Sequence, residues 1–157
     1  MSTGTTSTVV RHSIMIEAPV EKVFSVFTDD IGSWWPPEHH LGQVAEMVFE
    51  ARVGGHIYDR MTDGTESHWA RVLAYEPPTR LVFSWDVNPT WQIEVDPDRT
   101  SEVEVRFSAQ GPNTTRIDLE HRHIERHGQG WEQLRDAVGS EGGWPLGLGR
   151  LRERLAA

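Results

Sequence analysis

Cysteine is absent from this 157-residue chain, and positive charge is scarce. Without a thiol the protein has no disulfide, no cysteine nucleophile and no cysteine-ligated zinc or iron–sulfur site. The 15 lysine and arginine residues against 24 aspartate and glutamate residues give a formal net charge of -9. Because binding to phosphate groups needs a clustered positive face, this balance predicts no nucleic-acid partner.

Long apolar runs are also missing. No run approaches the roughly 20 residues that span a bilayer. Residues 1–8 are mainly serine, threonine and glycine, without the apolar stretch of a signal peptide. We therefore expect no membrane insertion, a cytoplasmic location and a disordered segment over residues 1–8. Residues 9–157 have the length of one domain.

Tryptophan, in contrast, is abundant: seven tryptophans outnumber five phenylalanines and two tyrosines. An indole combines a large apolar area with one N–H donor. A high count of this residue therefore suits a site whose walls are apolar but must still orient a polar group.

The first third of the chain predicts a strand followed by two short helices. Apolar residues alternate loosely over residues 9–17, which is typical of a strand. Pro19 fits the first position of a helix, and apolar residues then recur at spacings of three and four up to Ile31. A second helical turn carries Trp34 and Trp35 before two prolines end it.

Six strand-like runs and a long helix follow. The runs are separated by glycine, proline and asparagine turn signals and cover residues 43–51, 56–61, 67–75, 79–87, 102–107 and 116–123. The last part is helical and is interrupted once, over residues 139–143. This order predicts an α+β fold in which an antiparallel sheet buries one face against the terminal helix. Where a curved sheet wraps a helix incompletely, a pocket is expected between them.

Several blocks of sequence resemble one known family. They are Ile16-Glu-Ala-Pro-Val-Glu-Lys-Val-Phe24, Trp34-Trp35-Pro36, Val53-Gly54-Gly55, Pro77-Pro-Thr-Arg-Leu-Val-Phe-Ser-Trp85, Val103-Glu-Val-Arg-Phe107, Arg116-Ile-Asp-Leu-Glu-His121 and Gly143-Trp144-Pro145. In this order they resemble the bacterial homologues of the activator of heat-shock-protein-90 ATPase, within the START-like SRPBCC helix-grip superfamily.

The resemblance implies a single START-like domain over residues 9–157. A curved antiparallel sheet of six or seven strands would surround a long C-terminal helix, with two short helices after the first strand and a cavity between sheet and helix. Members of the superfamily bind lipids, sterols, hormones or polyketides, and some are cyclases or hydrolases. Ala51, Asp59, Ala70 and His123 depart from the family pattern beside or within the expected cavity, so ligand preference does not transfer.

His121 and His123 are the most informative polar residues. Side chains alternate along a strand, so both should face inward with Ile117 and Leu119 if the strand is regular. An inward histidine could be a general base, a hydrogen-bond anchor for a ligand or a metal ligand. The structural alternative is a hydrogen bond to a backbone carbonyl or a tryptophan N–H. A bulge at the strand end would turn His123 outward.

The other histidines do not have metal-ligand spacing. They are His39, His40, His56, His68 and His127, and no HExxH motif is present. The one arrangement with shared parity is His121 and His123 with Glu125. We expect no metal site and no cofactor.

We expect the cavity to be lined mainly by aromatic residues. Met47, Phe49, Trp85 and Phe107 share the parity of neighbouring apolar residues. The remaining candidates for ligand contact are Trp35, Trp69, Asp59, Trp131, His121 and His123. We expect Trp34, Trp91 and Trp144 to share the walls of the cavity. Glu50, Tyr58 and Glu66 could also reach the cavity mouth with Asp59, although charged strand residues mostly face solvent.

These features predict a monomeric or homodimeric protein that binds a small hydrophobic or aromatic molecule, with His121 as the polar anchor. One alternative is a cyclase-like or hydrolytic enzyme that uses His121 or Asp59 as acid or base in the same cavity. A second alternative is a co-chaperone-type protein-binding domain, which only the family's name suggests.

Overall fold

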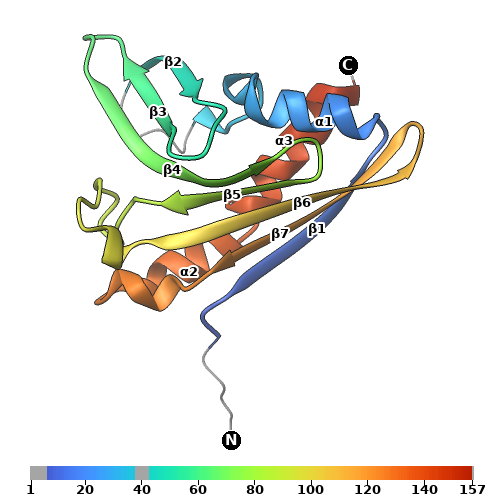
Figure 1. Ribbon diagram of the computed structural model, residues 1–157. Helices are drawn as coiled ribbons and strands as arrows, with labels where there is room; N and C mark the ends of the chain where they lie inside the picture. Colours follow the sequence, from blue (N-terminus) through green and yellow to red (C-terminus); the bar gives the residue numbers. More distant parts are fainter. Residues whose placement is uncertain (1–6, 38–42, 157) are drawn as a thin grey trace, which may run out of the picture.

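A single antiparallel sheet and the helices packed on it form the architecture of the computed structural model, which describes residues 7–37 and 43–156 (Figure 1). The strands are β1 (Val10–Ile16), β2 (Val44–Phe49), β3 (His56–Met61), β4 (Glu66–Glu76), β5 (Arg80–Trp85), β6 (Ser101–Gly111) and β7 (Thr114–Arg122). Their order across the sheet is β1-β7-β6-β5-β4-β3-β2. The seven strands confirm the predicted antiparallel sheet.

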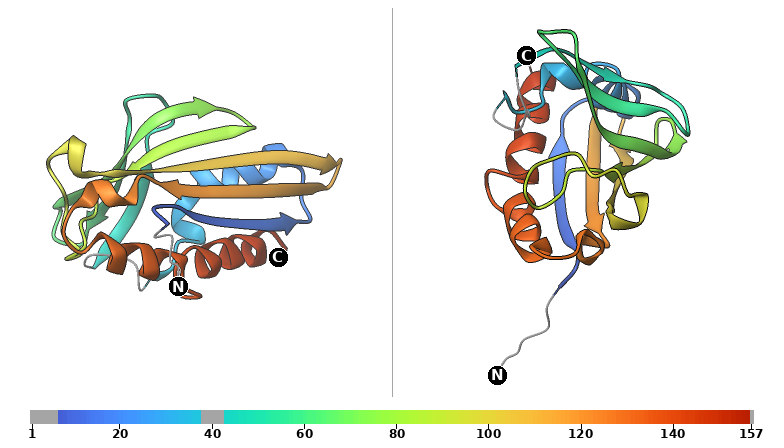
Figure 2. Two further views of the ribbon diagram at one scale, coloured as in Figure 1. Left: turned by 90° about the horizontal axis from the view of Figure 1, so that it is seen from below. Right: turned by 90° about the vertical axis from the view of Figure 1, so that its left-hand side faces the viewer.

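The helical elements are α1 (Val20–Thr28), α2 (Trp131–Gly139) and α3 (Trp144–Ala156), with short 3-10 turns η1 (Ile31–Ser33), η3 (Pro97–Arg99) and η4 (Ile124–His127). Figure 2 shows α2 and α3 following one another along the same face of the sheet. This is the predicted helix-grip arrangement, with the helix interrupted once. No helix within residues 7–37 and 43–156 has the length and apolar character needed to cross a membrane.

Alternation along β6 and β7 divides the sheet into an apolar inner face and a charged outer face. Val103, Val105 and Phe107 pair with His121, Leu119 and Ile117 on the inner face, and all six side chains are buried. On the outer face Glu104 forms ion pairs with Arg80, Arg106 and Arg122. The inner residues thus form the core, whereas the outer residues link strands through charge.

Helix α1 covers one end of the inner face. Its apolar stripe places Phe24 and Phe27 over Phe107, with ring centroids 5.0 and 5.5 Å away. The helix ends at Thr28, whose hydroxyl donates a hydrogen bond to the carbonyl oxygen of Phe24. This end of the sheet is therefore filled by side chains.

The junction between α2 and α3 depends on a glycine. A Cβ atom on Gly143 would lie 2.2 Å from the carbonyl oxygen of Val138 and 2.5 Å from that of Ala137. Glycine thus permits the start of α3 to approach the end of α2. The close junction brings Trp144 against the inner face of the sheet, where it is buried.

Candidate functional site

A pocket of about 470 Å³ lies between the sheet and the α2–α3 junction. Its lining residues come from three regions: the strand side, the segment after η1, and the two C-terminal helices with their junction. They are Trp35, Pro36, Asp59, Trp69, Trp85, Val87, Trp91, Ala137, Val138, Ser140, Gly142, Gly143, Trp144 and Gly147. The pocket therefore lies where the sequence predicts incomplete coverage of the sheet.

Four buried indoles in the wall contact one another. Trp35 lies 4.8 Å from Trp69 and 6.0 Å from Trp144, measured between ring centroids. Trp85 lies 5.8 Å from Trp69 and 5.6 Å from Trp144. We call these four residues the indole cluster. Aromatic pairs at such separations attract one another beyond the burial of their area, so the cluster forms a stiff apolar wall.

Each indole is positioned by a different element. Trp69 and Trp85 project from the inner faces of the neighbouring strands β4 and β5. Trp35 follows η1, where its backbone N–H donates to the carbonyl oxygen of Ile31 at 3.1 Å. Trp144 begins α3 directly after the close helix junction. The wall thus joins segments that lie far apart in the sequence.

Asp59 is the one charged side chain among the described residues that line the pocket. It projects inward from β3 and is 3% exposed. The Trp69 Nε1–H donates to Asp59 Oδ1 at 3.3 Å, which ties the carboxyl group to the indole cluster. Trp85 Nε1 is also buried, and within the described residues it has no hydrogen-bond partner.

His121 lies behind the wall in a buried hydrogen-bonded chain. Trp144 Nε1–H donates to His121 Nδ1 at 3.1 Å, so the neutral ring carries its hydrogen on Nε2. That nitrogen lies 2.7 Å from Ser101 Oγ, and Ser101 Oγ lies 2.7 Å from His127 Nε2. The chain therefore runs from Trp144 through His121 and Ser101 to His127.

Burial keeps both of these histidines neutral. It lowers the pKa of His121 to about 3, with a further decrease from the charge of His127. Burial also lowers the pKa of His127 to about 4, which the negative charges of Glu94 and Asp86 only partly oppose. His121, whose two ring nitrogens are already paired, is poorly suited to act as a general base. His121 faces inward as its parity predicts, but it supports Trp144 rather than lining the pocket.

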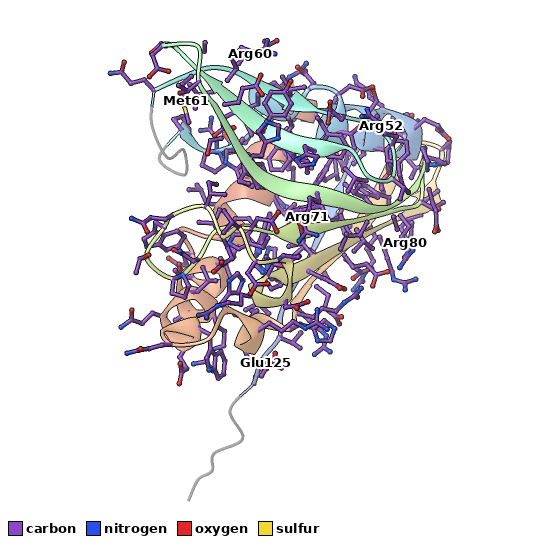
Figure 3. The ribbon with its side chains drawn as sticks, turned by 60° about the vertical axis from the view of Figure 1, so that its left-hand side comes forward. Arg52, Arg60, Met61, Arg71, Arg80 and Glu125 are labelled. Atoms are coloured by element: carbon purple, nitrogen blue, oxygen red, sulfur yellow. The ribbon has the colours of Figure 1, made fainter. Side chains whose placement is uncertain are left out.

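His123 does not continue the strand that its sequence pattern predicts. Strand β7 ends at Arg122, and His123 adopts a left-handed conformation with φ of 60° at the start of η4. Glu125, labelled in Figure 3, is exposed on the same turn. The structure thus corrects the expectation that regular alternation carries His121, His123 and Glu125 to one face.

The described residues contain no group of three or more histidine, aspartate or glutamate side chains arranged to hold a metal ion. His56 and His68 lie on neighbouring strands, with their Nδ1 atoms 3.0 Å apart, and His68 Nε2 lies 2.9 Å from Glu66. Tyr58 stacks on the His68 ring at 4.4 Å. The candidates His39 and His40 lie outside the described residues.

The structure brings four of the predicted ligand-contact residues together in the pocket: Trp35, Asp59, Trp69 and Trp85. Trp91 and Trp144, expected to share the walls, also line it.

The other candidates lie elsewhere. Phe107 packs under α1, and Met47 and Phe49 are half-buried on the edge strand β2. Trp131 lies under Arg135, whose guanidinium carbon is 5.2 Å from the centroid of the indole ring. Parity identified the face of these residues but not the part of the interior that they reach.

Sequence reasoning missed the small residues of the helical wall. Gly143 lies just before α3 and Gly147 lies within it, and both line the pocket. Gly147 was an available signal for missing side-chain volume in the helical wall, whereas Gly143 permits the close approach of α2 and α3. The hydrogen bonds of Ser101 had no such signal, because its partners are 20 and 26 residues away.

Comparison with known proteins identifies relatives with this architecture. The family model described as "Activator of Hsp90 ATPase homolog 1-like protein" matches residues 17–156. The solved anthrahydroquino-γ-pyrone synthase Txn09 is 39% identical, with 93% of this chain and 96% of that chain covered and a TM-score of 0.67.

CalC from Micromonospora echinospora, a self-sacrificing resistance protein, is 29% identical, with 95% of this chain and 94% of that chain covered and a TM-score of 0.70. Protein NE0264 from Nitrosomonas europaea is 17% identical and shares the fold, with 95% of this chain and 94% of that chain covered and a TM-score of 0.68. Among curated proteins no match is found. A fold of this kind fits a ligand-binding or cyclase-type protein.

Proposed function

Because the chain belongs to the activator of Hsp90 ATPase homolog 1-like family, we propose that it binds a small aromatic or apolar molecule in the pocket beside the indole cluster. The observation that carries this proposal is the convergence of Trp35, Trp69, Trp85 and Trp144 on a pocket of about 470 Å³. Pockets of roughly 300–1,000 Å³ with mainly apolar and aromatic walls are typical of small-molecule sites.

The charge of the site favours a neutral or cationic ligand. Asp59 is the charged group among the described lining residues, and its carboxyl group is nearly excluded from solvent. An anionic ligand would meet like charge at low local dielectric, which is unfavourable. The net charge of -9 adds to this preference at longer range.

One relative supports an aromatic ligand. The 39% identical structure is named as an anthrahydroquino-γ-pyrone synthase, a name that refers to fused aromatic rings. Stacked and edge-on contacts with indoles suit ligands of this kind, because they add to the free energy gained by burying apolar area. We therefore place an aromatic ligand ahead of an aliphatic one.

A binding experiment with the neutral dye 1,8-dihydroxyanthraquinone tests the proposal. The dye should quench tryptophan fluorescence saturably, because the indole cluster would contact it. Gly147→Leu adds a side chain at the pocket wall and should weaken binding about tenfold or more, since space for the ligand is lost.

Gly149→Leu is the matched control, because nothing lies within 4 Å of a Cβ atom at Gly149. It should leave the affinity unchanged. Equal affinities for the two variants, with helical content preserved by circular dichroism, would place the dye outside this pocket.

Asp59 supports a second candidate function, catalysis of ring closure or hydrolysis. A carboxyl group held in an apolar wall can accept or donate a proton next to a bound ligand. His121 is less suited to that role, because it is sealed behind Trp144 and its pKa is lowered to about 3. If the protein is an enzyme of this type, Asp59→Asn should retain ligand binding and lose turnover.

A further inference from the structure

Trp91 differs from the other tryptophans that line the pocket. It is 48% exposed, whereas Trp35, Trp69, Trp85 and Trp144 are at most 7% exposed. It does not belong to the sheet or to a helix but to the connection between β5 and η3. Among the described residues it has no aromatic neighbour within ring-contact distance, and about half of its surface is accessible where it lines the pocket.

The backbone of Trp91 is held in an unfavourable conformation. Its φ is 63°, in the left-handed region that bulky residues rarely adopt. Such strain persists only where surrounding contacts impose it, and it is enriched at ligand clamps and active sites. An exposed tryptophan that contributed only to packing would gain little from this conformation.

Asn88 imposes the conformation through a compact turn. Its Oδ1 accepts hydrogen bonds from Thr90 N at 3.0 Å, Thr90 Oγ1 at 2.8 Å and Gln92 N at 3.0 Å. The Trp91 N–H donates to the Asn88 carbonyl oxygen at 2.8 Å, and the Asn88 N–H donates to the Gln92 carbonyl oxygen at 2.8 Å. An isolated bridge between Val87 and Ile93 closes the base of the turn. The turn thus fixes the backbone of Trp91, and with it the point from which the indole projects, before any ligand arrives.

We propose that Trp91 is a specificity-determining residue, which stacks its exposed indole on a flat ring at the pocket mouth and so selects planar over globular ligands. This inference rests on the proposed function of the same pocket. The buried indole cluster accommodates any apolar molecule of suitable volume. A pre-positioned flat surface, in contrast, favours a ligand with a flat face of its own, because the stacking area is then largest.

Two cationic probes separate shape from charge. 9-Aminoacridine is planar and 1-aminoadamantane is globular, and both carry one positive charge at neutral pH, so their attraction to Asp59 is similar. Isothermal titration calorimetry with the intact protein gives the ratio of their affinities. Trp91→Ala should weaken binding of 9-aminoacridine by about tenfold, as expected for loss of one stacking surface. Binding of 1-aminoadamantane should change by less than about twofold.

Three further variants define the role of the indole. Trp91→Phe keeps a flat ring and should recover most of the selectivity. Asn88→Ala leaves the indole present but removes the side chain that fixes the turn, so it should lower the selectivity for the planar probe by a few-fold. Val95→Ala is the control, because Val95 follows the same loop and is 90% exposed; it should have no effect.

The outcomes distinguish this inference from the proposed function. If the unaltered protein binds neither of these probes nor 1,8-dihydroxyanthraquinone, both the inference and the proposed function are overturned. If the unaltered protein binds 9-aminoacridine, and Trp91→Ala leaves the ratio of the affinities for the two probes unchanged, the role of Trp91 is refuted. Ligand binding in the pocket remains supported in that case. Equal weakening of both probes would make Trp91 an unselective part of the wall and would also refute the role.

Discussion

Ser101 shows how one small residue organises the interior of this protein. Its hydroxyl accepts from His121 Nε2–H and donates to His127 Nε2, at 2.7 Å in both cases. A hydroxyl can accept and donate at once through a single oxygen atom, as the two neutral rings require. Because His121 in turn accepts from Trp144, the hydroxyl also sets the orientation of an indole in the pocket wall.

Removing this hydroxyl should destabilise the fold. Ser101→Ala leaves the Nε2–H of His121 and the Nε2 of His127 buried without partners, and each unpaired buried group costs roughly 1–3 kcal/mol. We expect the free energy of unfolding in urea to fall by about 3 kcal/mol. Ser108 lies exposed on the same strand. Ser108→Ala should therefore change the free energy of unfolding by less than about 0.5 kcal/mol. Similar values for the two variants would contradict the proposed hydrogen-bonded chain.

At the scale of elements, the sequence predicts the order of strands and helices well because the patterns are local. The alternation around Val103 and Leu119 identifies β6 and β7, whose inner faces are buried as expected. The glycines of residues 139–143 and the following proline predict the break between α2 and α3. Each of these signals depends on neighbours in the sequence.

The pocket residues are harder to predict. The alternation of side chains along a strand identifies its inner face, but it does not identify which element covers that face. Phe107 and Trp85 both point inward, yet α1 covers Phe107 while Trp85 borders the pocket. The end of β7 is another case: the left-handed conformation of His123 is imposed where the chain turns into η4. Asp59 was a candidate for ligand contact on a strand whose charged residues were expected mostly to face solvent; it is buried, and Trp69 on the next strand donates a hydrogen bond to it.

Two glycines of the C-terminal helical segment should respond to alanine in opposite ways. Gly143→Ala would place a Cβ atom 2.2 Å from the Val138 carbonyl oxygen, so α2 and α3 must move apart. We expect a loss of more than about 2 kcal/mol in the free energy of unfolding, together with weaker ligand binding. Gly149→Ala points to open space within α3 and should stabilise the protein by about 0.5–1 kcal/mol through helix propensity.

Thermal and urea unfolding of the two glycine variants provide the measurement. The comparison is internal, because both substitutions add the same methyl group to the C-terminal helical segment, one just before α3 and one within it. A gain in stability for Gly143→Ala would mean that the helix junction is looser than the structure indicates.

For the whole molecule, the two faces of the sheet respond to acid through different groups. On the outer face, burial would raise the pKa of Glu104, but hydrogen bonds from Arg80 and Arg122 outweigh burial and lower it. Its contribution to stability is present above the pKa of an unfolded glutamate and is lost only as pH falls below that range. In the interior, His121 on β7 and His127 on η4 are held neutral. Their effect on stability begins at a higher pH than that of Glu104, because the pKa of an unfolded histidine is higher than that of a glutamate.

We expect the protein to lose stability between pH 7 and pH 5. The pKa of His121 falls from 6.5 to about 3 on folding, and that of His127 falls from 6.5 to about 4. In this range the unfolded chain therefore binds protons that the folded chain does not, so stability decreases as pH falls. Each histidine should contribute a loss of roughly 2 kcal/mol, which gives about 4 kcal/mol for the pair.

Urea unfolding at pH 7, 6 and 5, followed by far-ultraviolet circular dichroism, measures this loss. His127→Gln is the informative variant, because its amide oxygen can still accept the Ser101 hydroxyl hydrogen while the titrating group is gone. It should reduce the loss between pH 7 and pH 5 to about half. If the unaltered protein is as stable at pH 5 as at pH 7, neither ring keeps its lowered pKa in the folded state, and both take up a proton there. A sealed chain from Trp144 to His127 would then be untenable, because a charged His121 has no free nitrogen to accept the indole hydrogen.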